Sequence, residues 1–119
     1  MSIVLKRAYE NPGPADGYRV LVDRLWPRGI SKERADLDEW MREVSPSEEL
    51  RKWYHENLGR WSEFRRRYLA ELKTHRNKLR SLARQARAHR VTLVYASADT
   101  EHNNAVVLKQ YLKMLGAKD

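Results

Sequence analysis

The chain has 119 residues, of which 41% are hydrophobic and none is cysteine. This length suits a single domain with its own hydrophobic core, and the lack of cysteine excludes disulfides, thiolate metal sites and thiol nucleophiles. The formal net charge is +8, and segment 60–90 carries 11 Lys and Arg against two acidic residues, so an electrostatic partner should meet that segment.

The N-terminal part of the chain predicts two strands separated by a turn. The apolar segment 3–9 has no helical period and is typical of a strand. The sequence Asn11-Pro12-Gly13-Pro14 predicts a turn, and the β-branched run within 18–25 predicts a buried strand that Pro27 ends. The connection between these strands is short for a parallel crossover, so a hairpin remains an open alternative.

The middle of the chain has a helical pattern. The apolar residues of segment 36–44 recur at the spacing of one helix face: Leu37, Trp40, Met41 and Val44. A strand over the same segment remains an alternative. A second helix begins either at Ser45, which fits a capping box with Glu48, or at Ser47, the competing N-cap.

The C-terminal part predicts one strand and one helix. Segment 91–96 is the clearest strand of the sequence. A polar loop follows it, in which Asp99 or Thr100 is the expected N-cap of a closing helix. His102 would then lie in the first turn of that helix, and Gly116 would end it.

Strands that alternate with amphipathic helices predict an α/β fold. We expect a single domain over 1–119, with three layers and a short, mainly parallel sheet flanked by helices; a mixed sheet is the alternative. Segments 18–25 and 91–96 should be parallel neighbours, because both are apolar runs suited to a sheet buried on two faces.

The sequence also carries expectations about location. Residues 1–9 lack the apolar core and cleavage site of a signal peptide, and no apolar run approaches the length of a membrane span. We therefore expect a cytoplasmic protein without membrane contact. The sequence leaves the oligomeric state open.

Four stretches of the chain carry a resemblance to a known family. They are DGYRVLVDRLWPRG (16–29), PSEELRKW (46–53), WSEFRRRY (61–68) and YASADTEHNNAVVL (95–108). In these stretches the chain resembles the YeaO-like branch of the domain-of-unknown-function 488 proteins. The resemblance implies a small α/β fold and assigns no activity, so the site is argued from chemistry.

Polar residues cluster where predicted strands end, and ligands of open α/β sheets bind beyond the carboxyl ends of strands. Segment 18–25 and the residues after it supply Asp23, Arg24, Trp26 and Arg28. Segment 91–96 and the residues after it supply Tyr95, Ser97, Asp99, His102 and Asn103. The start of the middle helix adds Ser47 and Arg51. We expect these residues to line one crevice.

Within this crevice, Asp23 and His102 are the predicted catalytic pair, because a carboxylate beside an imidazole suits general acid/base work. Arg24 or Arg28 would hold a phosphate or carboxylate group. The other residues named above are predicted ligand contacts. No two histidines lie three or four residues apart, so no metal is expected, and nothing indicates a cofactor. Whether the protein is an enzyme or a binder stays open.

The basic segment supports a second class of function. Apolar residues mark two helix faces, at 61–72 and 79–86, which one continuous helix can also carry. In that case five cations form one stripe: Lys73, Arg76, Arg80, Arg84 and Arg87. The sequence favours an anionic, phosphate-bearing or nucleotide ligand in the crevice. Weak nucleic-acid binding without sequence specificity is the alternative.

Overall fold

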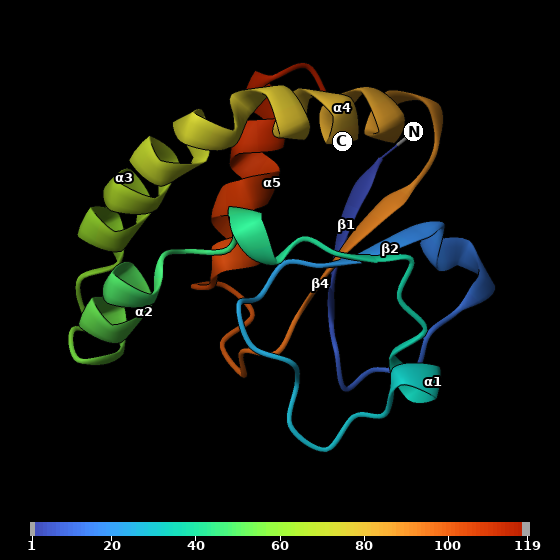
Figure 1. Cartoon of the computed structure of the whole chain (residues 1–119), viewed down its shortest axis with the longest axis horizontal. Coiled ribbons are helices and arrows are strands. Elements are labelled where there is room, and N and C mark those ends of the chain that lie inside the picture. The colour runs from blue at the N-terminus through green and yellow to red at the C-terminus, as the bar shows by residue number, and fades with distance from the viewer. Residues whose placement is uncertain (1, 118–119) are drawn as a thin grey trace.

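All strands of the sheet run parallel, in the order β1-β4-β2-β3. The computed structural model describes residues 2–117, and its strands are β1 (Ile3–Arg7), β2 (Tyr18–Leu21), β3 (Glu39–Trp40) and β4 (Val91–Tyr95). Figure 1 shows the long strands side by side. The parallel pairing of β2 with β4 confirms the sequence prediction for these two segments.

The first two strands do not form a hairpin, and the mixed-sheet alternative is wrong. Both β1 and β2 pair with β4, so that Ile3 and Tyr18 each lie opposite Val91. All five residues of β4 are buried, as the central position in the sheet requires. Residues 8–17, which include the short helix η1 (Pro14–Asp16), therefore carry the chain across β4.

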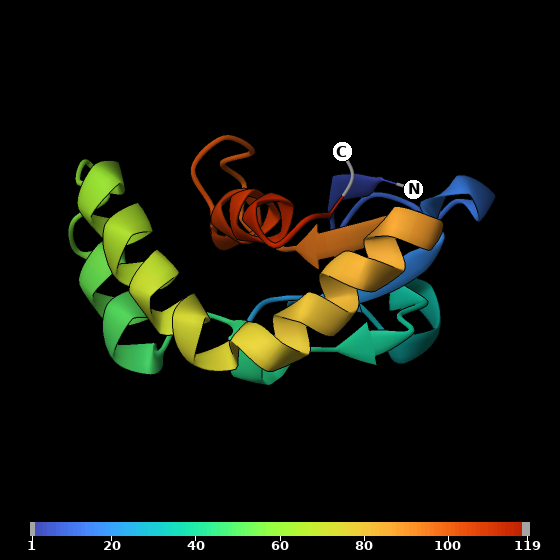
Figure 2. The same ribbon diagram turned by 90° about the horizontal axis from the view of Figure 1, so that it is seen from above.

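Among the described residues, four helices of eight or more residues carry apolar patterns of the sequence, and the other helical elements are single turns of three or four residues. In chain order, these elements are α1 (Lys32–Ala35), η2 (Arg42–Val44), α2 (Glu48–His55), α3 (Trp61–Leu72), η3 (Lys73–His75), α4 (Arg76–Ala88) and α5 (Asn104–Met114). The α3 and α4 helices are not continuous, because η3 lies between them, and Figure 2 shows the two helices as an arc.

The two faces of the sheet are covered differently. On one face, buried residues of α3, α4 and α5 form the main core with Val20, Val91 and Leu93. On the other face, a smaller cluster centres on Leu21 and Val94. The views in Figures 1 and 2 place α5 and α1 on opposite sides of the sheet. The α/β class is thus confirmed, and the layer on the second face consists of short helices and loops.

Segment 36–44 is not a helix: it contains the edge strand β3 and the single turn η2. The helical spacing was misleading because its residues face different clusters. Leu37 and Trp40 pack on the smaller cluster, whereas Met41 and Val44 are buried in the main core. A chain that crosses the edge of a sheet can therefore imitate an amphipathic helix over eight or nine residues.

The middle helix begins after Ser47, not after Ser45. The Ser47 hydroxyl accepts a hydrogen bond from the Leu50 amide at 3.1 Å, whereas the Ser45 hydroxyl donates to the Arg42 carbonyl at 2.6 Å. Within residues 2–117, no helix combines the length and the apolar character needed to cross a membrane.

Candidate functional site

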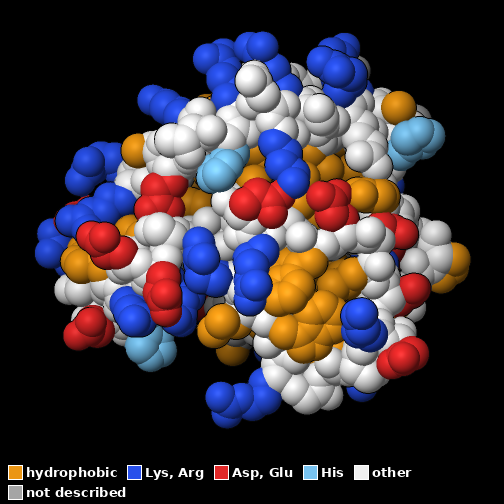
Figure 3. Space-filling view, in the orientation of Figure 1, with side chains coloured by type: hydrophobic (Ala, Val, Ile, Leu, Met, Phe, Trp, Pro, Cys, Tyr) orange, Lys and Arg blue, Asp and Glu red, His pale blue; other side chains and the backbone are white. Residues whose placement is uncertain are grey.

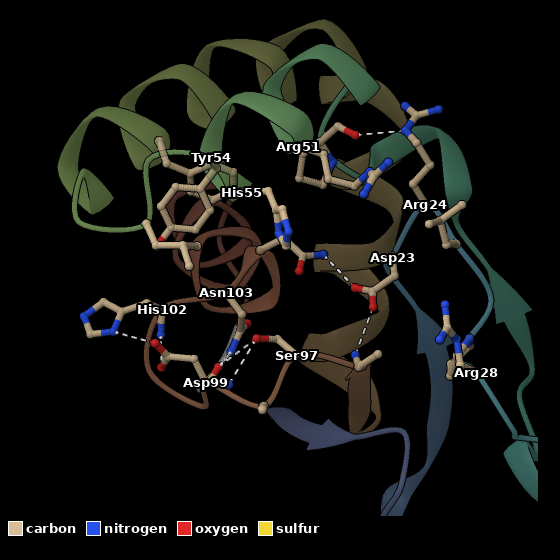
Figure 4. A pocket seen from close by; sticks show the side chains of 18 of the residues that line it. Asp23, Arg24, Arg28, Arg51, Tyr54, His55, Ser97, Asp99, His102 and Asn103 are labelled. Carbon is tan, nitrogen blue, oxygen red and sulfur yellow. Dashed lines mark hydrogen bonds and ion pairs between the residues drawn. The ribbon is translucent and has the colours of Figure 1, made fainter.

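A cleft of about 670 Å³ lies beyond the carboxyl ends of β2 and β4. Its lining comes from the loop after β2, the loop after β4, the start of α5, and α2 with its flanking loops (Figure 4). Most of the lining is apolar. The cleft occupies the position at which parallel α/β sheets bind ligands, because neighbouring parallel strands end at the same edge.

The structure brings most of the predicted site residues into this cleft: Asp23, Arg24, Trp26, Arg28, Arg51, Ser97, Asp99, His102 and Asn103. Two predicted residues lie elsewhere. Tyr95 is buried in the main core. Ser47 is the N-cap of α2, donates a hydrogen bond to Glu71 Oε2 at 2.6 Å, and lines a separate cavity of about 240 Å³. Its hydroxyl is therefore occupied by structural contacts.

Several residues that line the cleft were not predicted from the sequence, notably Leu25, Tyr54, Leu58 and Asn104. Tyr54 belongs to the apolar pattern of α2, so its spacing indicated a core residue. Leu25 and Leu58 are exposed apolar side chains in loops, for which periodicity gives no signal. Asn104 follows a predicted site residue directly, and this adjacency was the one available sign.

Asp23 lies at the floor of the cleft and ties its two sides together. One carboxylate oxygen accepts the Ala96 amide at 2.9 Å, and the other accepts the Asn104 side-chain amide at 3.0 Å. Burial raises the pKa of Asp23, and these two hydrogen bonds act in the opposite direction. Asp23 thus connects the end of β2 to the end of β4 and to the first residue of α5.

The predicted direct pair between Asp23 and His102 is not formed. His102 Nδ1 lies 3.2 Å from Asp99 Oδ2, and the imidazole meets the Trp61 ring in a T-shaped arrangement at a centroid distance of 5.1 Å. Asp99 Oδ1 also accepts the backbone amides of Glu101 and His102, so the loop closes on itself. Figure 4 shows His102 beside Asp99 and apart from Asp23.

The closing helix begins later than the sequence analysis predicts. Asn103 is its N-cap, with a side-chain oxygen that accepts the Val106 amide at 3.1 Å. The predicted caps Asp99 and Thr100 are therefore wrong, and His102 lies before the helix. The N-terminus of α5 nevertheless faces the cleft, where its dipole adds positive potential.

Three arginines line the cleft together with two carboxylates, Asp23 and Asp99. Arg24 Nε donates to the Pro46 carbonyl at 3.0 Å, and among residues 2–117 neither Arg24 nor Arg28 forms an ion pair. Arg51 Nη2 lies 3.9 Å from the exposed carboxylate of Glu48. The Nε atom of Arg51 is buried and has no hydrogen-bond partner within the described residues.

Comparison with known proteins places the chain among uncharacterised relatives. The sequence profile described as the Inactive DUF488-N3 subclade matches residues 2–119. The Uncharacterized protein YeaO of Escherichia coli (strain K12) is 46% identical over 115 residues, which cover 97% of this chain and all of that protein. The Uncharacterized protein Rv3073c of Mycobacterium tuberculosis (strain ATCC 25618 / H37Rv) is 42% identical over 106 residues, or 89% of each chain. No solved structure gave a significant match.

Proposed function

The chain belongs to the Inactive DUF488-N3 subclade of the DUF488 family, and from this premise we propose that it binds a small anionic ligand in the cleft without transforming it. The family assignment agrees with the resemblance seen in the sequence. The word "Inactive" in the family description favours binding over turnover.

The three arginines that line the cleft are the observation that carries the proposal. Within residues 2–117, Arg51 is paired only with the exposed carboxylate of Glu48, which lies 3.9 Å from its Nη2 atom. Arg24 and Arg28 line the same cleft and bring two more cations. Guanidinium groups bind phosphate and carboxylate with paired, charge-assisted hydrogen bonds, so an anion is the complementary ligand.

The contacts of the two predicted catalytic groups favour a binding role as well. Both oxygens of Asp23 already accept hydrogen bonds from the protein, which suits a group that positions the cleft walls. His102 is engaged by Asp99 at the other side of the cleft. We therefore propose that Asp23 and His102 act separately and do not form an acid/base pair.

Arg51→Gln should weaken binding of pyrophosphate, used as a probe, by about 10- to 100-fold, because a hydrogen bond to a charged group contributes about 1.5–3 kcal/mol. Calorimetric titration measures the affinity. Arg66→Gln is the matched control, since Arg66 is an exposed arginine of α3 that does not line the cleft. The proposal fails if the parent does not bind pyrophosphate at millimolar concentration, or if Arg66→Gln weakens binding as much as Arg51→Gln.

A second candidate function is weak nucleic-acid binding by α4. Four arginines of this helix are exposed and form no ion pair within residues 2–117: Arg76, Arg80, Arg84 and Arg87. Lys78 differs, because Glu39 and Glu43 neutralise it. Figure 3 shows cationic side chains gathered along the edge of the molecule where Figure 1 draws α4. Lys73 lies in η3, outside this helix, so the continuous helix on which the predicted five-cation stripe depended is not formed.

The triple variant Arg76→Gln, Arg80→Gln, Arg84→Gln should bind DNA with a flatter salt dependence. Each lost phosphate contact reduces the slope of log K against log salt by about 0.9, so a change of about 2–3 is expected. Fluorescence anisotropy at several salt concentrations measures the slope. A control variant in which Lys32, Arg34 and Lys52 are replaced by glutamine removes the same number of positive charges outside α4. It should leave the slope nearly unchanged. Equal slopes for the parent and the α4 triple would identify the stripe as a solvated surface only.

A further inference from the structure

The cleft has arginines on one side, while the opposite side combines aromatic surface with the Asp99–His102 pair. Figure 4 shows Arg24 and Arg28 on one side, Tyr54 and His102 on the other, and Asp23 between them. A ligand that satisfies only the arginines would leave the opposite side of the cleft uncovered. The positions of these side chains therefore indicate the shape and polarity of the ligand as well as its charge.

The side opposite the arginines has an aromatic wall. The Tyr54 ring stacks on Phe64 at a centroid distance of 4.3 Å and an interplanar angle of 25°. Phe64 is 3% exposed and stacks in turn on Trp61 at 5.6 Å. Because Phe64 and Trp61 support the half-buried Tyr54 from behind, Tyr54 offers a fixed, flat surface to a ligand.

Two exposed leucines lie at the mouth of the cleft. Leu25, in the loop after β2, is 55% exposed, and Leu58, in the loop between α2 and α3, is 64% exposed. They are two of the four large hydrophobic side chains that are exposed within residues 2–117. Covering apolar side chains with an apolar ligand surface lowers the free energy of the complex. An inorganic anion has no such surface.

We propose that the cleft binds an amphiphilic anion, that is, a flat aromatic body carrying one phosphate or carboxylate group. This inference rests on the proposed function, because Arg51 and Arg24 would hold the anionic group. The aromatic body then lies along Tyr54 and is covered by Leu58. A volume of about 670 Å³ falls in the range of pockets for drug-sized ligands and far exceeds the space that inorganic phosphate fills.

The test compares four probes: phenyl phosphate, benzoate, inorganic phosphate and the neutral benzyl alcohol. Titrations followed by NMR of the backbone amides should show phenyl phosphate or benzoate binding at least about tenfold more tightly than inorganic phosphate or benzyl alcohol, because only the first two engage both sides of the cleft. Either order of phenyl phosphate and benzoate supports the proposal and identifies the preferred anionic group.

A variant of the apolar side gives the matched comparison. Leu58→Asn should weaken phenyl phosphate about 3- to 10-fold and leave inorganic phosphate unchanged, since the change removes only apolar cover. Met114→Asn is the control, because Met114 is also 64% exposed and lies outside the cleft. Neither ligand should respond to it.

The outcomes separate this inference from the proposal on which it rests. If inorganic phosphate binds the parent as tightly as phenyl phosphate, or if Leu58→Asn weakens the binding of both compounds equally, the inference of an amphiphilic ligand is overturned. The proposal of an anion site then still stands. If none of the three anions binds, the proposed function is overturned with it.

Discussion

Asp16→Asn should lower the free energy of unfolding by about 3–5 kcal/mol, because it leaves Arg19 as a buried charge without its partner. Arg19 Nη1 lies 2.6 Å from Asp16 Oδ2, and the two side chains are 4% and 10% exposed. Lys6 Nζ is 3.0 Å from the other carboxylate oxygen, so one acid compensates two cations. Asparagine keeps the size of the side chain, removes its charge and replaces one acceptor oxygen with an NH₂ donor.

Urea unfolding measures this loss, with Glu48→Gln as the control. Glu48 is 61% exposed and forms a pair with Lys52, so its replacement should change stability by less than about 0.5 kcal/mol. An Asp16→Asn protein as stable as Glu48→Gln would show that the buried cluster contributes nothing beyond a surface pair.

The same carboxylate predicts a pH dependence. Burial alone would raise the pKa of Asp16, but hydrogen bonds from Gly13, Lys6 and Arg19 outweigh it and lower the pKa. A lowered pKa means that the stabilisation is present above the unfolded-state pKa, about 3.9, and is lost as the pH falls through the folded-state pKa. The difference in stability between the parent and Asp16→Asn should therefore shrink as the pH falls below about 4.

The sequence predicted the parts of the fold that depend on continuous apolar runs. Strands β2 and β4 and their parallel pairing follow from such runs, since both are buried within a covered sheet. The helix predicted for segment 36–44 is wrong, because the position of this segment at the sheet edge, and not the spacing of its apolar residues, decides which cluster each side chain joins. The pairing of both β1 and β2 with β4 also explains the short connection at 8–17, for which a hairpin had been the alternative.

The order of the strands predicted where the site residues lie better than the chemistry of the side chains predicted which of them pair. The ends of two parallel neighbours placed Asp23, Arg24 and Asp99 at one cleft, as expected. The pairing of side chains was not predictable in the same way, because Asp99 lies three residues before His102 and its carboxylate contacts the imidazole within the same loop. The aromatic wall was missed because the stacking of Tyr54 on Phe64 joins two helices, and periodicity describes each helix alone.

A single glycine next to β2 sets the spacing at the other end of these strands. Gly17 has φ 67° and ψ −133°, a conformation that side-chain-bearing residues rarely adopt. A Cβ atom there would lie 2.3 Å from the Arg90 carbonyl oxygen. That oxygen accepts the Tyr18 amide at 2.9 Å, immediately before the register pair Tyr18 and Val91. The backbones of β2 and β4 thus approach too closely for any side chain.

Gly17→Ala should therefore destabilise the protein by about 2–6 kcal/mol, through backbone strain and through the forced separation of the two strands. Gly59→Ala is the control, because a Cβ atom at Gly59 meets no atom within 4 Å and needs no positive φ; its unfolding midpoint in urea should match the parent. The cleft should respond too, since Asp23 and the Ala96 amide meet only if β2 and β4 keep their spacing. An alanine variant with parental stability would mean that the strands can separate at Gly17 without cost, and the fixed spacing that holds Asp23 in place would have to come from the cleft end alone.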